Sequence, residues 1–451
     1  MPIKIDCFKA YDIRGRIPDQ LNADVAYRVG NATAQFLGAQ KMVLGRDIRL
    51  SSQELSDAVA RGIRDAGAEV MDIQLGGTEM VYFATDYLDA DGGIMVTASH
   101  NPADYNGLKI VREQARPVSA DSGLQDIRAI AEADTRLKAK KRGVHAPVNI
   151  FEPYIDHLLS YIDLKQLKPL KLVVNPGNGG AGIAMDGLRE RLPFEFIDVN
   201  YAPDGTFPNG IPNPMLLENQ SVTSEAVIKH GADMGIAWDG DFDRCFLFDD
   251  RGGFIEGYYI VGLLAESILR RNPGGKIIHD PRLTWNTLDI VAAAGGEAVQ
   301  SKSGHSFIKE KMREVDAVYG GEMSAHHYFR EFSYADSGMI PWLLVAELIS
   351  SSGKSLSDLV SARQAKFPAS GEINREVADA RRTLTVLHDR YASEALHVDD
   401  LDGYSFEFEN WRFNIRMSNT EPVVRLNVES RGDVGLMHDK TSEILRVLDS
   451  V

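Results

Sequence analysis

The sequence predicts a mixed α/β protein with three related domains and a smaller C-terminal α+β domain. Its 451 residues suffice for about three or four domains of ordinary size. Three times, at residues 43–47, 172–175 and 276–280, an apolar run leads through Gly, Asp, Asn or Pro into a helix-like pattern. This repeat favours several α/β domains over one large sheet.

Basic or glycine-rich surface segments interrupt the periodicity and indicate the domain boundaries. They predict domains at residues 1–147, 148–252, 253–368 and 369–451. In the last domain, alternating polar and apolar residues at 404–409 and 411–416 predict a small antiparallel sheet. A helix over residues 434–448 is expected to close the chain.

The first strand-turn-helix repeat shows how the elements are recognised. Residues 51–66 place Leu55, Ala58, Val59 and Ile63 on one helical face. Ser51 and Glu54 have the spacing of a capping box, and Gly67 is expected to end the helix.

Composition and charge exclude several classes of protein. With 44% hydrophobic and 25% charged residues, the chain is typical of a globular protein. It has no long apolar run and no signal-peptide pattern, so we expect a cytosolic location and no membrane partner. A net charge of −16 disfavours nucleic acid, and an anionic substrate would need a local cluster of Arg and Lys. Two cysteines, Cys7 and Cys245, are too few for a disulfide framework or a paired zinc site.

The first loop with candidate catalytic or binding groups is Thr-Ala-Ser-His-Asn-Pro at residues 97–102. It follows a buried-strand pattern and offers hydroxyl, imidazole and amide groups before a proline. Such a loop suits a nucleophile, here Ser99, or a bound phosphate; ordinary turn chemistry is the alternative.

The second loop is acidic. Asp239, Asp241 and Asp243 alternate between two apolar runs, and they repel one another unless a cation lies between them. Oxygen-only ligands favour Mg²⁺ or a similar hard ion. An EF-hand is excluded because Arg244 occupies the position that needs glycine. A haloacid-dehalogenase-like phosphatase, in which Asp239 itself would be phosphorylated, stays open as an alternative.

A glycine-rich stretch suggests a different class. Residues 177–182 have the Gly-x-Gly-x-x-Gly spacing of a dinucleotide-binding loop, and Asp198 follows about twenty residues later. Asn175 and Pro176 before the first glycine disturb the usual strand-to-turn passage. We therefore favour a loop that closes a βα unit, with an oxidoreductase as the remote alternative.

Two further polar loops are candidates for binding a substrate. Residues 320–327 present Glu322, Ser324 and His326 at alternating positions, a pattern suited to vicinal sugar hydroxyls. Residues 416–422 combine Arg416 with short hydrogen-bond donors, which is typical of a phosphate cradle.

Together these segments resemble the motifs of the α-D-phosphohexomutases. The resemblance rests on residues 8–15, 97–102, 239–244, 321–326 and 416–422, in order along the whole chain. The Glu-Met-Ser-x-His form of the sugar loop is most similar to the bacterial phosphomannomutase branch. The resemblance implies four domains around a central cleft. It also implies interconversion of hexose 6-phosphate and hexose 1-phosphate, most naturally of mannose, through a phosphoserine and a hexose 1,6-bisphosphate that also acts as activator. Phosphoglucomutase or dual-specificity activity is the alternative.

The resemblance also assigns roles to residues. Ser99 would carry the phosphate, and Mg²⁺ would be held by Asp239, Asp241, Asp243 and a phosphoserine oxygen. Lys109, His305 and Arg14 are the candidate catalytic groups around the reacting oxygen. The candidate substrate-binding residues are Tyr11, His100, Arg244, Arg282, Glu322, Ser324, His326, Arg416, Ser418, Asn419 and Thr420.

Three positions depart from the pattern of the family. Arg282 stands where relatives usually carry a lysine, and arginine cannot donate a proton near neutral pH. Ala325 replaces a frequent glycine, and residues 76–80 replace a segment that usually contains proline. These changes affect the expected sugar specificity, because mannose and glucose differ only at C2.

Overall fold

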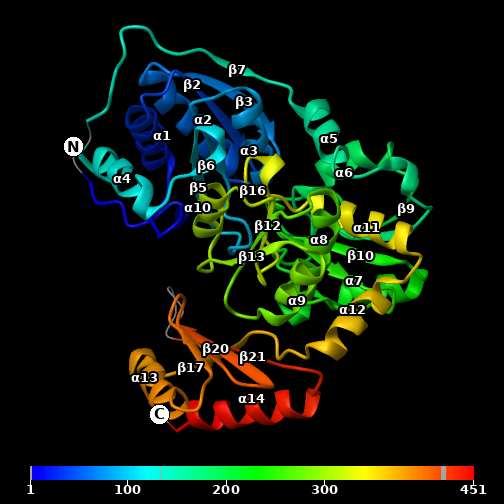
Figure 1. Cartoon of the computed structure of the whole chain (residues 1–451). Helices are drawn as coiled ribbons and strands as arrows, with labels where there is room; N and C mark the ends of the chain where they lie inside the picture. The colour runs from blue at the N-terminus through cyan, green and yellow to red at the C-terminus, as the bar shows by residue number, and fades with distance from the viewer. Residues whose placement is uncertain (1–2, 134, 418–422, 451) are drawn as a thin grey trace. The chain divides into compact units, whose positions relative to one another are not determined.

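The computed structural model describes residues 3–133, 135–417 and 423–450. Figure 1 shows its helices and strands. The chain forms two compact units, each built from two stretches of sequence. Unit 1 comprises Met1–Phe254 and His326–Gly353, and unit 2 comprises Ile255–Ala325 and Lys354–Val451.

The first sheet of unit 1 is mixed. Its strands follow the order β1 (Ile13–Arg16), β5 (Tyr105–Arg112), β4 (Gly92–Val96), β2 (Lys41–Arg46), β3 (Glu69–Leu75) and β7 (His145–Pro147), with β6 (Arg116–Pro117) beside β5. Strands β4, β2, β3 and β7 run parallel, whereas β1 and β5 are antiparallel to their neighbours. The helices of this region are α1 (Ala23–Leu37), α2 (Ser52–Asp65), α3 (Thr78–Tyr87) and α4 (Leu124–Ala133).

Helices α1 and α2 pack closely because glycines lie at their contact. A Cβ atom on Gly62 would lie 2.1 Å from the carbonyl oxygen of Tyr27, and one on Gly30 would lie 2.5 Å from that of Val59. The predicted apolar face of α2 is buried. The predicted capping box is wrong. Ser51 already has helical dihedral angles and makes no cap, since its hydroxyl accepts a hydrogen bond from Asn106 Nδ2 at 2.8 Å.

The second sheet of unit 1 has the order β11 (Cys245–Phe248), β10 (Met234–Trp238), β8 (Lys171–Asn175) and β9 (Glu195–Asp198). Strands β8, β9 and β10 are parallel, and β11 returns antiparallel to β10. Helices α5 (Phe151–Leu159), α6 (Ala181–Arg189) and α7 (Ser221–His230) belong to this region. The later stretch of unit 1 adds β15 (His327–Phe329), β16 (Ala335–Asp336) and α11 (Ile340–Ser352).

Glu79 joins the two stretches of unit 1. Its side chain is fully buried and accepts hydrogen bonds from the Tyr154 hydroxyl at 2.6 Å and the Ser337 hydroxyl at 2.9 Å. The backbone N–H groups of Gly338 and Met339 also donate to it, at 2.6 and 3.2 Å. The carboxyl group therefore satisfies donors just before α11, while burial raises its pKa to about 8.

Unit 2 begins with a parallel sheet in the order β13 (Glu297–Gln300), β12 (Lys276–His279) and β14 (Tyr319–Gly321). Its helices are α8 (Gly257–Arg271), α9 (Trp285–Ala293), α10 (His305–Val315) and α12 (Leu356–Lys366). The strand predicted at residues 276–280 is β12.

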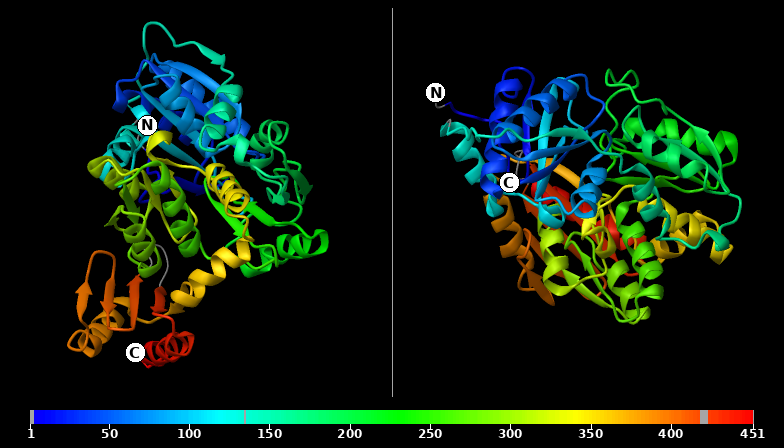
Figure 2. Two further views of the ribbon diagram at one scale, coloured as in Figure 1. Left: turned by 45° about the vertical axis from the view of Figure 1, so that its right-hand side comes forward. Right: turned by 90° about the horizontal axis from the view of Figure 1, so that it is seen from above.

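The C-terminal part of unit 2 is an antiparallel sheet in the order β17 (Ile373–Glu376), β21 (Val423–Ser430), β20 (Trp411–Met417), β19 (Tyr404–Glu407) and β18 (His397–Asp399). Helices α13 (Ala380–Tyr391) and α14 (Val434–Leu448) cover one face of this sheet (Figure 2). Their apolar residues share one core with the strands. The predicted antiparallel sheet and the closing helix are confirmed.

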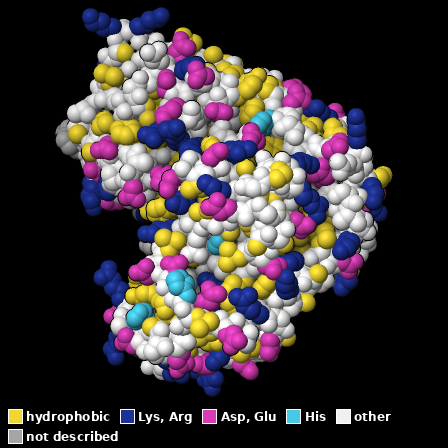
Figure 3. Space-filling model, viewed as in Figure 1, with side chains coloured by type: hydrophobic (Ala, Val, Ile, Leu, Met, Phe, Trp, Pro, Cys, Tyr) yellow, Lys and Arg dark blue, Asp and Glu magenta, His cyan; other side chains and the backbone are white. Residues whose placement is uncertain are grey.

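Acidic and basic side chains are interspersed over the face of the molecule that Figure 3 presents. Among the residues that the structure describes, no helix is long and apolar enough to cross a membrane.

Candidate active site

Ser99 lies on a constrained turn directly after β4. Its φ of 48° is uncommon for a residue other than glycine, and such strain is frequent at functional sites. The Thr97 hydroxyl accepts a hydrogen bond from Ser99 N at 2.9 Å and fixes the turn. The Ser99 hydroxyl donates to Asp239 Oδ2 at 2.7 Å. The sequence-predicted nucleophile and the acidic loop therefore meet.

The acidic loop connects β10 and β11, which form an antiparallel hairpin. Asp239 and Asp241 are fully buried, and Asp243 is nearly so. Each contributes a ligand atom to a group whose atoms all lie within 4.8 Å of one another. In all three carboxylates, Oδ1 is buried and has no hydrogen-bond partner among the described residues.

These unpartnered oxygens fit a divalent cation. A buried carboxylate oxygen without a donor is costly, and three of them in one short loop need a positive charge nearby. Burial, followed by the like charge of Asp241, raises the pKa of Asp243 well above its usual value. An all-oxygen donor set is the kind preferred by hard ions such as Mg²⁺.

Two cations hold the other carboxylate oxygens. Lys109, on β5, donates from Nζ to Asp241 Oδ2 at 2.7 Å and to Asp243 Oδ2 at 2.5 Å. Although burial opposes its charge, these two carboxylates raise the pKa of Lys109. Arg244 donates to Asp239 Oδ2 from Nε at 2.9 Å and from Nη2 at 2.8 Å. Burial opposes the charge of Asp239, but Arg244 outweighs it and lowers the pKa of Asp239 well below its usual value.

His100 and Arg14 border the same turn. His100 Nδ1 lies 3.0 Å from the Ser99 hydroxyl and 2.5 Å from Arg244 Nη2. Because arginine has only donors, Nδ1 must accept from Arg244, and burial together with this cation lowers the pKa of His100. Arg14, on β1, donates to Asp12 at 2.8 Å. Tyr11 is partly buried beside this strand.

The segment at residues 76–80 supports the acidic loop. A Cβ atom on Gly77 would lie 2.1 Å from the Phe242 ring. Thr78 N donates to Asp241 O at 3.1 Å, and the Thr78 hydroxyl donates to the Asp241 carboxylate. Residues 76–80, which depart from the pattern of the family, therefore pack against the candidate metal-binding loop.

The glycine-rich stretch at residues 177–182 packs against the acidic loop as well. Gly180 N donates to Gly240 O at 3.1 Å. A Cβ atom on Gly179 would lie 3.0 Å from the same carbonyl oxygen. Gly179 and Gly180 thus allow a close backbone approach, in keeping with a loop that closes a βα unit.

Arg49 fixes the backbone of the Ser99 loop by hydrogen bonds, and the sequence analysis did not identify it. Its guanidinium is buried and donates to four backbone carbonyl oxygens: those of Ser99 at 2.9 Å, Asn101 at 2.6 Å, Pro102 at 2.7 Å and Tyr105 at 3.0 Å. It pairs with Asp47 at 3.4 Å. One side chain therefore fixes most of the loop backbone.

We expect Arg49→Ala to lower kcat about a hundredfold, because a misplacement of about 1 Å in a reacting group has an effect of that size. The measurement is phosphosugar turnover, with the melting temperature followed in parallel. Arg61→Ala, on the exposed face of α2, is the matched control and should leave turnover unchanged. Full turnover in Arg49→Ala would show that the loop holds its shape without the guanidinium.

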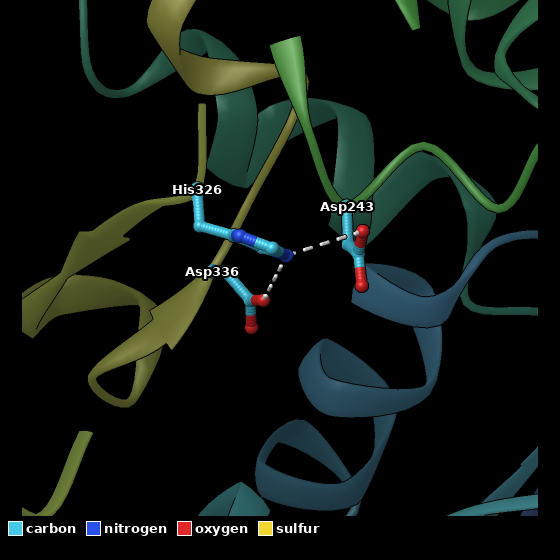
Figure 4. Close-up of side chains that lie close together, drawn as sticks. All are labelled: Asp243, His326 and Asp336. Atoms are coloured by element: carbon cyan, nitrogen blue, oxygen red, sulfur yellow. Dashed lines mark ion pairs between the residues drawn. The ribbon is translucent and has the colours of Figure 1, made fainter. Parts of the chain in front are cut away.

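The structure places His326 beside the acidic loop. Its Nε2 lies 3.8 Å from Asp243 Oδ1 and 4.0 Å from Asp336 Oδ2. Figure 4 shows the imidazole lying between these two carboxylates. His326 thus contacts a candidate metal ligand, whereas Glu322 and Ser324 of the same sequence motif belong to unit 2.

A second group of predicted site residues lies within unit 2. Arg282, which follows β12, donates to Asp280 from Nε at 3.0 Å and from Nη2 at 2.7 Å. Asp280 also accepts from Met323 N at 2.9 Å, and Arg282 Nη2 lies 3.7 Å from Glu322 Oε1. This pairing brings Arg282 to the predicted sugar loop.

Some of the remaining predicted site residues belong to the described part of the chain, and others do not. His305 begins α10, and the preceding residue, Gly304, donates from N to Glu322 Oε1 at 2.8 Å. Arg416 lies near the end of β20. Ser418, Asn419 and Thr420 lie outside the described residues.

Comparison with known families matches all four parts of the chain. The models described as phosphoglucomutase/phosphomannomutase α/β/α domains I, II and III match residues 6–138, 152–253 and 256–367. The model of the C-terminal domain matches residues 372–446. The predicted fold class, three α/β domains and a smaller C-terminal domain, is confirmed.

Curated relatives are similar over nearly their whole length. The chain is 59% identical to a phosphomannomutase of Escherichia coli, covering 99% of both chains. It is 60% identical to a protein named phosphohexose mutases from Xanthomonas campestris, covering 98% of this chain and 99% of that one. The chain therefore belongs to the phosphoglucomutase/phosphomannomutase family, and the resemblance drawn from its motifs is confirmed. Within that family, its curated relatives place it in the phosphomannomutase branch.

Solved structures agree with this fold. A phosphoglucomutase/phosphomannomutase family protein from Burkholderia thailandensis has a TM-score of 0.88 at 32% identity and covers 99% of this chain and 98% of its own. A phosphomannomutase-like protein from Thermus thermophilus has a TM-score of 0.81 at 22% identity, covering 99% of this chain and all of its own, which supports the fold alone.

Proposed function

We propose that the protein interconverts hexose 6-phosphate and hexose 1-phosphate, with mannose phosphate as the substrate. The observation that carries this proposal is the position of Ser99. Its hydroxyl lies on a strained turn, 2.7 Å from Asp239, beside three buried carboxylates with unpartnered oxygens. A phosphoserine of about −1.5 to −2 charge at this point needs a cation shared with those carboxylates.

The reaction then has two phosphoryl transfers. Phosphoserine 99 gives its phosphoryl group to the free hydroxyl of a hexose monophosphate, which loses a proton and becomes a 1,6-bisphosphate, and the Ser99 oxygen gains a proton. After the bisphosphate turns over, the Ser99 hydroxyl loses its proton as it takes the other phosphoryl group, and the released sugar oxygen gains a proton. The bisphosphate also serves as the activator that phosphorylates Ser99 initially.

The residues around Ser99 suit these steps. Lys109 is held as a cation by Asp241 and Asp243, so it stabilises negative charge or gives a proton rather than accepting one. His305, which belongs to unit 2, is the other candidate for moving a proton, and its assignment rests on the motif match. Arg14 and His100 border the Ser99 turn and add donors for the phosphoryl oxygens.

The metal in this proposal is Mg²⁺. Asp239, Asp241, Asp243 and an oxygen of phosphoserine 99 would hold it, since the three Oδ1 atoms are available. When bound, it neutralises charge on the transferring phosphoryl group.

The aspartyl-phosphate alternative is disfavoured by the surroundings of Asp239. One of its oxygens already accepts two hydrogen bonds from Arg244 and one from Ser99. These donors stabilise the carboxylate as an anion and occupy that oxygen, whereas the Ser99 hydroxyl lies on the strained turn that follows β4.

Arg416 is assigned to the phosphate that is not reacting, together with Ser418, Asn419 and Thr420. Glu322, Ser324 and His326 are assigned to the sugar. Tyr11, Arg244 and Arg282 complete the candidate substrate contacts. The cytosolic location and the absence of nucleic-acid and membrane partners stay predictions.

We expect Arg416→Ala to lower kcat/KM about ten- to a hundredfold, as loss of one charged hydrogen bond of about 1.5–3 kcal/mol implies. Both directions should be affected equally, because the same group would hold the non-reacting phosphate in both half-reactions. The measurement is kcat/KM with 1-phosphate and with 6-phosphate, and the intact mass should still show phosphorylation. Impairment of one direction alone would contradict a shared phosphate site.

The substrate is tested by comparing turnover of mannose 1-phosphate, glucose 1-phosphate and glucosamine 6-phosphate with Mg²⁺ and catalytic glucose 1,6-bisphosphate. We expect mannose 1-phosphate to give the highest kcat/KM. Equal turnover of mannose and glucose would indicate dual specificity, an alternative favoured by the relative named phosphohexose mutases. Turnover of none would overturn the proposal.

A further inference from the structure

A partly buried carboxylate, Glu372, lies among three arginines in unit 2. Its Oε2 is 3.1 Å from Arg416 Nη2 and 3.5 Å from Arg282 Nη1, and its Oε1 is 3.4 Å from Arg425 Nη1. The Glu372 side chain is 13% exposed. Burial opposes its charge, but the three arginines outweigh burial and lower the pKa of Glu372, so it is an anion at neutral pH.

The sheet register explains why an anion is needed at this position. Arg416 on β20 stands directly opposite Arg425 on β21, and like charges in that arrangement repel. Glu372 immediately precedes β17, which pairs with β21 so that Asn374 faces Arg425. The fold therefore places one carboxylate beside a pair of opposed arginines.

The charges of this cluster balance. Arg282, Arg416 and Arg425 carry three positive charges. Glu372 together with Asp280 and Glu322, the two other carboxylates near Arg282, carries three negative charges. Counted over these six described residues, the cluster is neutral without a ligand, yet Arg416 begins the segment assigned to a phosphate dianion.

A further carboxyl group, that of Glu256, lies near Glu372. Glu256 precedes α8, and burial and the charge of Glu372 raise its pKa. A Cβ atom on Gly371 would lie 3.3 Å from Glu256 Oε1. Glu256 is therefore close enough to Glu372 for the charge of one carboxyl group to disfavour ionisation of the other.

We propose that Glu372 is an internal counter-ion that competes with the phosphate of the substrate for Arg416 and Arg425. It keeps the opposed arginines in place before the substrate binds, and it lowers the affinity of these arginines for the phosphate. Rapid release follows, which a mutase needs because its bisphosphate must turn over between the two transfers. This inference rests on the proposed function, since it takes the ligand to be a phosphosugar.

The test is calorimetric binding of mannose 1-phosphate to proteins that all carry Ser99→Ala, so that no phosphoryl transfer occurs. Adding Glu372→Gln removes the charge and retains the shape of the side chain. We expect its Kd to fall about tenfold, the change produced by about 1.4 kcal/mol, and the gain to shrink as salt is added. Disrupted folding alone does not tighten binding. A lower Kd would therefore indicate loss of the competing counter-ion, whereas a higher Kd would be expected from a damaged fold.

Two variants serve as controls. Glu372→Asp retains the charge and should bind as the parent does, while Glu376→Gln, an exposed position on β17, should leave Kd unchanged. Unchanged or weaker binding by Glu372→Gln, with an unaltered melting temperature, would overturn the counter-ion role. The same conclusion holds if Glu372→Gln melts at a lower temperature and does not bind mannose 1-phosphate more tightly than the parent does. In that case, parent-like binding by Glu372→Asp would show that the carboxylate only stabilises the structure. If the Ser99→Ala parent bound no mannose 1-phosphate, the proposed function would fail instead.

Discussion

Turnover should fall about a thousandfold or more in Ser99→Ala, in both directions of the reaction, as expected when a nucleophile is removed. The alanine has no oxygen to carry the phosphoryl group between the two positions of the sugar. The surrounding fold should persist, because the turn is held by Thr97 and Arg49 through the backbone. The measurement is kcat with mannose 1-phosphate and catalytic glucose 1,6-bisphosphate, together with the intact mass of the protein.

The position of the phosphate gives an independent readout. Phosphopeptide mapping of the wild-type protein should place the label on Ser99, and the label should survive hydroxylamine, which cleaves an aspartyl phosphate. Ser361→Ala, at an exposed position of α12, is the control and should keep full turnover and full labelling. A label on Asp239 would make the enzyme an aspartyl-phosphate phosphotransferase.

The second large effect is expected for Asp241→Asn. Asp241 supplies one of the three unpartnered oxygens and also accepts from Lys109 and Thr78. An amide lowers the negative charge of the loop by one unit and directs N–H donors where a cation would lie. We expect the affinity for Mg²⁺ to fall at least about tenfold and kcat about a hundredfold.

Calorimetry with Mg²⁺ alone measures the affinity without relying on turnover. Asp439→Asn, an exposed position on α14, should bind Mg²⁺ as the wild-type protein does. If Asp241→Asn retained the wild-type affinity, the acidic loop would be neutralised by Lys109 and Arg244 alone, and the metal would have to bind elsewhere.

The sequence by itself determined the elements and the loops that follow them. The apolar runs before residues 97 and 239 became β4 and β10, because a buried strand needs little more than continuous apolar residues between turn signals. Ser99 and the three aspartates could be singled out for the same reason: each group lies within one short segment. The sheet and the closing helix of the C-terminal domain were likewise predicted from local periodicity.

Local patterns failed where a side chain found a distant partner. Ser51 has the spacing of a capping box, but its hydroxyl is used by Asn106. The glycines at 177–182 have the spacing of a dinucleotide loop, but two of them, Gly179 and Gly180, pack against Gly240. In both cases a tertiary contact replaces the interaction that the local spacing favours.

Only the tertiary structure decided how the chemistry is supported. Arg49 reaches carbonyl oxygens about fifty residues away in the Ser99 loop, and Thr78 reaches Asp241 on another sheet. Glu372 meets Arg416 and Arg425 only because β17 and β20 both flank β21. A charged side chain in a buried space needs an oppositely charged or hydrogen-bonding partner, because an unpaired charge is costly there. That requirement depends on the packing of strands remote in sequence, and no local pattern records it.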